Sequence, residues 1–110
     1  MFAVWEPMLV TDWQRPGPPA LGRLPDARVH QYWDPAHLLA RSMAAAARDP
    51  QPTPKCCVRD GVLWDLAAVY PPGAKWEDRL PPAVFFDGPV VKVEGGLEAS
   101  LTRLPSAIAR

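Results

Sequence analysis

The chain has 110 residues, of which 48% are apolar, and its 12 basic residues balance its 12 acidic residues. This length allows one domain with a modest core, and the scattered, balanced charge argues against a nucleic-acid-binding or membrane-surface protein. No apolar run approaches the roughly 20 residues needed to span a bilayer, and the first ten residues lack the basic start of a signal peptide. We therefore predict a single cytoplasmic domain over residues 1–110.

The first elements expected along the chain are two strands joined by a turn-rich loop. Residues 2–10, FAVWEPMLV, are rich in β-formers, although Pro7 restricts them to an edge or bulged strand. A helical turn is expected over residues 19–24. Residues 27–34, ARVHQYWD, fit either a strand or a helix capped by Asp26, and their valine, tyrosine and tryptophan favour the strand.

The remaining elements are a helix, a strand, a hairpin and a second helix. Asp34 and Pro35 are typical of a helix start, which predicts a helix over residues 35–48. Residues 61–70 form an apolar strand pattern, residues 83–93 suggest a hairpin around the Asp87-Gly88 dipeptide, and residues 96–104 predict a helix. Its apolar side would consist of Leu97, Leu101 and Leu104. This order predicts an α/β fold with a mixed three- to five-stranded sheet flanked by helices.

Several stretches resemble the thioredoxin-like superfamily. The segment LPPAVFFDGPVVKVEGGLEASLTRL resembles its closing ββα unit, and VWEPML followed by TDW resembles its first central strand and redox loop. RVHQYWDPAHLLA and VLWDLAAVYPPGAKW are similar to stretches of bacterial members that lack the C-x-x-C motif. At the position of that motif, near residues 11–14, this chain has TDWQ. The resemblance thus implies a single thioredoxin-like domain without the usual redox site.

Both cysteines of the chain, Cys56 and Cys57, are adjacent, in KCCVRDG. Their Cα atoms must lie about 3.8 Å apart, below the usual disulfide range of roughly 4.4–6.8 Å, so a bond between them would be easily reduced. Such a pair suits reversible oxidation or capture of a soft metal, and the flanking Lys55 and Arg59 would favour thiolate. Alternatively, one cysteine packs in the core and the other has no role.

The resemblance also implies which residues surround the cysteines. A third central strand that begins near Val62, antiparallel to the first strand, would bring Cys56 or Cys57 to the vacated redox site. The residues expected there are Thr11, Asp12 and Trp13, with Trp13 and Trp76 shielding the pair and Tyr70 supplying a hydroxyl. A carboxylate as close as Asp12 would raise a thiol pKa and oppose thiolate formation.

Two other sets of polar residues are candidates for chemistry. Asp65 lies in an apolar strand pattern and, if buried, needs a donor such as an indole or an arginine, so a structural pairing is favoured over acid–base catalysis. His30 and His37 lack the spacing to the cysteines or to each other that zinc sites show. No metal and no cofactor are therefore expected.

These observations favour a non-catalytic thioredoxin-like domain that acts in protein binding or self-association, with a homodimer formed through an apolar patch centred on tryptophan or phenylalanine. The alternative is a thiol redox or soft-metal-binding protein that uses Cys56 and Cys57. No conventional catalytic motif is present, so an enzyme of this sequence would be a thiol–disulfide oxidoreductase.

Overall fold

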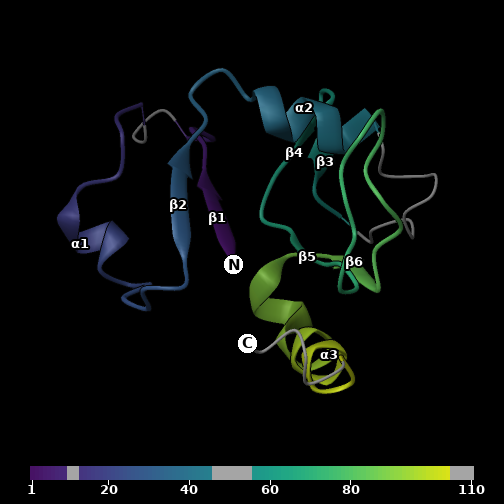
Figure 1. Ribbon diagram of the computed structural model, residues 1–110. Coiled ribbons are helices and arrows are strands. Elements are labelled where there is room, and N and C mark those ends of the chain that lie inside the picture. Colours follow the sequence, from purple (N-terminus) through teal and green to yellow (C-terminus); the bar gives the residue numbers. More distant parts are fainter. Residues whose placement is uncertain (10–12, 46–55, 105–110) are drawn as a thin grey trace. The chain divides into compact units, whose positions relative to one another are not determined.

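The computed structural model describes residues 1–9, 13–45 and 56–104 (Figure 1). The chain divides into two compact units, Met1–Leu39 and Ala40–Arg110. Among the described residues there are three helices and three two-stranded sheets. This confirms a mixed α/β chain, whereas the expected sheet of three to five strands is wrong for this part of the chain, because each strand pairs with one partner only.

The first unit contains a parallel strand pair. Strand β1 (Phe2–Trp5) pairs with β2 (His30–Trp33), with Phe2 opposite His30 and Trp5 opposite Trp33. A strand within residues 27–34 is thus confirmed. The strand predicted over residues 2–10 is much shorter, since β1 ends two residues before Pro7, which has no amide hydrogen to donate to a neighbouring strand.

Helix α1 (Pro18–Leu21) lies in the connection between these strands. Two side-chain hydrogen bonds link it to both strands. The Trp5 indole donates to Gln31 Oε1 at 2.9 Å, and Gln31 Nε2 donates to the Leu21 carbonyl at 3.0 Å. The helical turn expected over residues 19–24 is observed at Pro18–Leu21, so it begins one residue earlier and ends three residues earlier.

Helix α2 (Leu38–Ala45) begins three residues later than the predicted start at Pro35. The Asp34 carboxylate nevertheless accepts the amides of the first turn, from Leu38 at 2.8 Å and from Leu39 at 3.0 Å. Because Asp34 is buried, these bonds satisfy both the carboxylate and two helix amides that have no partner within the helix. The predicted helix end at residue 48 lies outside the described residues.

In the second unit, strands β3 (Val58–Arg59) and β4 (Val62–Leu63) form a tight antiparallel hairpin. Its two loop residues, Asp60 and Gly61, have φ values of 52° and 74°, which is the geometry that Asp-Gly turns favour. The single strand predicted over residues 61–70 is wrong. It is broken at Asp65, where φ is 47°, and continues as β5 (Ala67–Val69).

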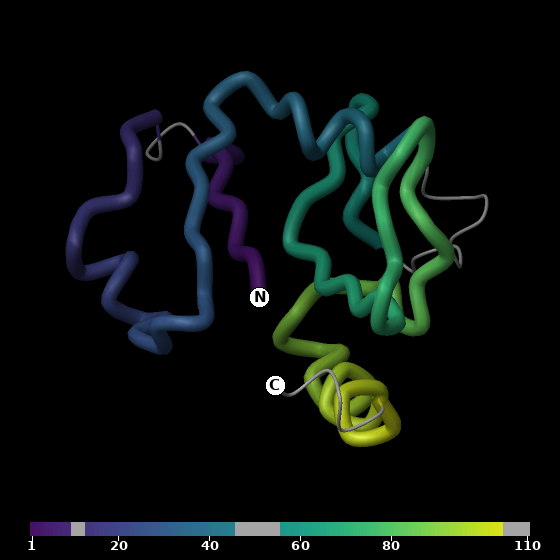
Figure 2. The backbone as a smooth tube through the Cα atoms, viewed as in Figure 1, coloured from purple at the N-terminus to yellow at the C-terminus, as the bar shows by residue number. Residues whose placement is uncertain are grey.

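The hairpin predicted over residues 83–93 is also wrong. Strand β6 (Phe85–Asp87) pairs antiparallel with β5 instead, and the backbones of these two strands run side by side in Figure 2. Helix α3 (Val90–Thr102) begins at the valines that were expected to form the second hairpin strand. Pro89 accounts for the change, because it cannot donate to a strand ladder and is well suited to precede a helix.

The core of the second unit lies between α2, β4 and β6. Its buried residues are Ala40, Val62, Leu63 and Phe86. Helix α3 packs against β5 and β6. A side chain at Gly96 would meet the Phe85 ring at 3.0 Å, so this glycine permits the close approach of the helix. Leu97 lies on the packed side of α3, but Leu101 is 52% exposed, so the predicted apolar side is only partly right.

Candidate functional site

The two adjacent cysteines are joined by a disulfide bond immediately before β3. Cys57 is buried, with 4% of its surface exposed, whereas Cys56 is partly exposed. Neither alternative from the sequence is excluded by burial alone, since one cysteine does pack inside. The buried sulfur of Cys57 is bonded to that of the partly exposed Cys56.

The backbone at Cys57 adopts a conformation that is rare for residues other than glycine. Its φ is 82°, and its carbonyl accepts a hydrogen bond from the Trp64 amide at 2.9 Å, just beyond the β3–β4 pairing. Non-glycine residues in such regions cost on the order of 1–3 kcal/mol, and they persist only where the surroundings hold them. Here the hairpin bond on one side and the disulfide on the other fix Cys57.

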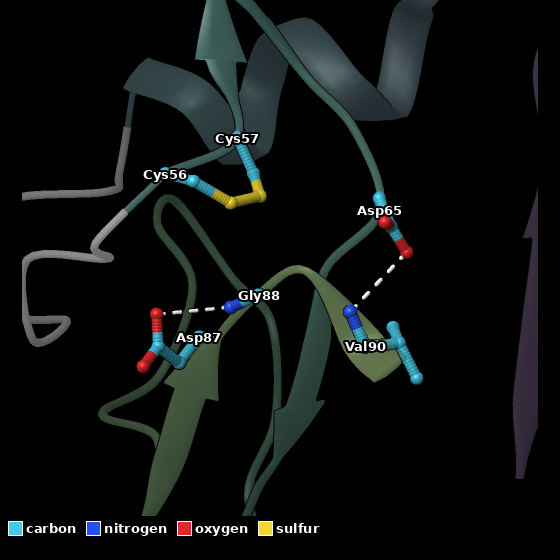
Figure 3. The surroundings of a disulfide bond; sticks show 6 residues. All are labelled: Cys56, Cys57, Asp65, Asp87, Gly88 and Val90. Atoms are coloured by element: carbon cyan, nitrogen blue, oxygen red, sulfur yellow. Dashed lines mark hydrogen bonds between the residues drawn. A yellow bond between two sulfur atoms is a disulfide. The ribbon is translucent and has the colours of Figure 1, made fainter. Parts of the chain in front are cut away.

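Gly88 lies directly against this buried sulfur. A Cβ atom placed on Gly88 would stand 2.9 Å from Cys57 Sγ and closer still to the Asp65 carbonyl oxygen. Figure 3 shows the Cys57 side chain pointing from β3 toward Gly88, in the segment between β6 and α3. Only a residue without a side chain fits this position, because real Cβ atoms do not approach other atoms so closely.

Two aspartates hold the same segment. Asp87 Oδ1 accepts the Gly88 amide at 2.9 Å, and Asp65 Oδ1 accepts the Val90 amide at 3.3 Å (Figure 3). The pairing predicted for Asp65 is therefore structural, but its donor is a backbone amide rather than an indole or an arginine. Asp65 is exposed and lies between the end of β4 and the start of β5 instead of inside a buried strand. Its carboxylate satisfies the first amide of α3, where a negative charge is also favourable.

The structure places the other predicted site residues as follows. Thr11, Asp12 and Lys55 lie outside the described residues, and Trp13 is an exposed residue of the first unit. The predicted meeting of the cysteines with Asp12 and Trp13 stays a prediction. Arg59 is exposed on β3, two residues from Cys57, so its proposed help to a thiolate is compatible with its position.

The pairing of β5 with β6 does not bring Tyr70 or Trp76 next to the disulfide. Asp87, the neighbour of Gly88, pairs with Ala67, whereas Tyr70 follows the opposite end of β5. The Tyr70 hydroxyl is buried without a hydrogen-bond partner in the described part of the chain, and burial raises the pKa of this phenol. Trp76 is about half exposed in the loop between β5 and β6.

Both histidines belong to the first unit, whereas the cysteines belong to the second. Within residues 1–9, 13–45 and 56–104, no cluster of three or more histidine, cysteine or acidic side chains could hold a metal ion. His37 instead lies 3.1 Å from a Glu6 carboxylate oxygen through Nδ1. Desolvation by burial raises the pKa of Glu6, and the contact with His37 only partly offsets it.

Sequence reasoning missed three residues around the disulfide as site residues, namely Asp87, Gly88 and Val90. The Gly-Pro dipeptide at 88–89 carried a usable signal, because a proline before an apolar run can mark a helix start as well as a strand boundary. Reading this proline as a helix start would have placed α3 directly after Pro89. The contact of Gly88 with Cys57, which are 31 positions apart, had no local signal.

No family model matches the chain, and no curated protein or solved structure is significantly similar to it. None of the helices within the described residues has the length and apolar character required to cross a bilayer. What the site can do is therefore argued from its own geometry.

Proposed function

We propose that this protein is a thiol-based redox protein in which Cys56 and Cys57 cycle between a disulfide and a dithiol. The observation that carries this proposal is the bond between the two sulfurs, with one cysteine partly exposed and the other buried against Gly88. A disulfide between neighbouring residues closes no long loop, so it adds little restraint to the unfolded chain. Reversible chemistry is a better reason for it than stabilisation.

The burial of the two residues assigns different roles to their sulfurs. An external thiolate attacks Cys56 Sγ, the bond between the cysteines breaks, and the Cys57 sulfur leaves as a thiolate that takes up a proton. A second thiolate then attacks the external sulfur of the mixed disulfide and releases a free disulfide and the Cys56 thiol. The protein gains two electrons and two protons, and two molecules of a small thiol such as glutathione, or one protein dithiol, are oxidised.

A cytoplasmic location, which the sequence predicts, fits a pair that cycles. Stable disulfides are rare in the cytosol because the glutathione and thioredoxin systems reduce them, whereas catalytic or redox-sensing ones form transiently. The thioredoxin-like fold inferred from sequence resemblance is also part of the proposal. Within their own units, the parallel β1–β2 pair and the antiparallel β5–β6 pair followed by α3 support it, whereas the larger central sheet that the resemblance implies is not formed by the described residues.

The roles of the two sulfurs are tested by trapping the mixed disulfide. Cys57→Ser and Cys56→Ser variants are incubated with oxidised glutathione, and each adduct is measured by intact-mass spectrometry. We expect the Cys57→Ser variant, which retains Cys56, to be modified much faster than the Cys56→Ser variant. The wild-type pair should equilibrate reversibly in glutathione buffers. Equal modification of both variants would contradict the assigned roles, and a wild-type pair that never reduces would contradict the function.

Self-association is a second candidate function, favoured by the exposed face of β1 and β2. Phe2 is 72% exposed and Tyr32 is 53% exposed, and the Phe2 ring lies 6.1 Å from the Tyr32 ring and 5.7 Å from the His30 ring. Such a cluster of exposed rings is typical of interaction sites. Sedimentation over a range of concentrations should show a dimer that Tyr32→Lys disrupts, with Trp76→Lys as the matched exposed control. A monomeric wild-type protein would refute this candidate.

A further inference from the structure

Three contacts connect the disulfide to the first turn of α3. Cys57 Sγ lies against Gly88, the Asp65 carbonyl lies against the same glycine, and the Asp65 carboxylate accepts the amide of Val90, the first residue of α3. Gly88 is itself buried, so its position is set by these neighbours. The sulfur of Cys57 therefore packs against a residue that lies only two positions before the start of α3 (Figure 3).

We propose that the oxidation state of Cys56 and Cys57 controls the order of the first turn of α3, with Cys57 and Gly88 as the connecting residues. This inference rests on the proposed redox function and specifies what the redox change regulates. The segment that responds comprises residues 88–92, from the glycine through the first turn of the helix.

The closed disulfide ring restrains the backbone at Cys57. In this ring Cys57 has a φ of 82°, which an L-residue other than glycine seldom adopts unless its surroundings impose it. Reduction by a thiol adds two electrons and two protons, breaks the bond and leaves two thiols that must move apart. Whichever sulfur moves, the ring no longer restrains Cys57, and only the hydrogen bond from the Trp64 amide to its carbonyl remains to hold the left-handed conformation.

The packing on Gly88 transmits this release. There is no free space between Cys57 Sγ and the Gly88 backbone, since even one added carbon at Gly88 would stand 2.9 Å from the sulfur. If the Cys57 sulfur moves away, Gly88 loses one of its packing contacts. If the sulfur moves inward, Gly88 must shift to avoid it. Both movements disturb the segment whose amides Asp87 and Asp65 hold.

Amide hydrogen exchange of the wild-type protein, oxidised and then reduced with dithiothreitol, tests the coupling without any substitution. We expect peptides that cover residues 88–92 to exchange roughly fivefold faster or more after reduction. Fivefold corresponds to the lower end of the free energy associated with a residue in such a backbone conformation. Peptides that cover the last turns of α3, residues 97–102, serve as the internal control and should exchange equally in both states. A Cys56→Ser, Cys57→Ser double variant should show no response to dithiothreitol.

The two proposals fail in different ways in this experiment. Intact mass and thiol alkylation report directly whether the pair has been reduced and can be reoxidised. Complete reduction with unchanged exchange over residues 88–92 overturns the coupling and leaves the redox function standing. A pair that cannot be reduced or reoxidised in the folded protein overturns both.

Discussion

Replacing Gly88 with alanine tests the packing around the disulfide most directly. The new methyl group would stand 2.9 Å from Cys57 Sγ and still closer to the Asp65 carbonyl oxygen. A flexible side chain could move aside, but this oxygen belongs to the backbone at a left-handed residue, φ 47°, that also holds α3 through its carboxylate. The clash must therefore be relieved by shifting the backbone.

The expected cost follows from comparison with a glycine that has space around it. Forcing one extra carbon into a packed site costs typically about 1–3 kcal/mol. Gly95, within α3, has no atom within 4 Å of a placed Cβ, so Gly95→Ala should stabilise the helix by about 0.5–1 kcal/mol. The two glycine-to-alanine variants should thus differ in free energy of unfolding by roughly 1.5–4 kcal/mol, with opposite signs relative to the wild-type protein.

Urea unfolding followed by tryptophan fluorescence measures this difference. With a slope of about 1–3 kcal/mol per molar urea, the midpoints of the two variants should be separated by on the order of 1 M. In a Cys57→Ala background the cost of Gly88→Ala should fall but not vanish, because the Asp65 carbonyl remains. A Gly88→Ala midpoint equal to that of the wild-type protein would refute the packing argument.

Three further predictions concern buried polar groups. Asp34→Ala should cost about 0.5–2 kcal/mol, because the first turn of α2 loses two accepted amides, and Asp34→Asn should cost less; chemical denaturation measures both. Glu6 has a pKa raised by burial, so its contribution to stability is present below the ordinary glutamate pKa and is lost as pH rises through the raised value. A Glu6→Gln variant should lack that loss, so its stability relative to the wild-type protein should increase from acidic to neutral pH, and parallel pH profiles would refute this. Tyr70→Phe should be neutral or stabilising, since it removes a buried hydroxyl that has no partner in the described part of the chain, and a marked drop in melting temperature would show that the hydroxyl is paired.

Local signals in the sequence correctly predicted several features of this protein. Asp34 stabilises the start of a helix, and residues 30–33 form a strand within the segment for which a strand was favoured. Each of these depends on residues that are close in the chain. Capping bonds, strand preference and the proximity of neighbouring sulfurs need no distant partner, so a short stretch of sequence contains the information.

Two similar turn signals in the sequence had different outcomes, and tertiary structure decided the strand that pairs with β6. Both Asp60-Gly61 and Asp87-Gly88 are favoured hairpin dipeptides, but only the first forms a hairpin, because Pro89 prevents a strand after the second. Strand β6 instead pairs with β5, whose residues lie 16 to 20 positions away in the chain. Residues this far apart meet only when the whole unit packs, so no local pattern could specify the pairing.

The surroundings of the disulfide show the same division. The sequence determined that the sulfurs of Cys56 and Cys57 lie near each other, because a single peptide link separates the two residues. The structure alone decided that Cys57 is buried, that its sulfur packs on Gly88, and that Asp65 joins this packing to α3. These contacts depend on β5, β6 and α3 assembling around one core, and the free energy of that packing is shared among residues throughout the second unit.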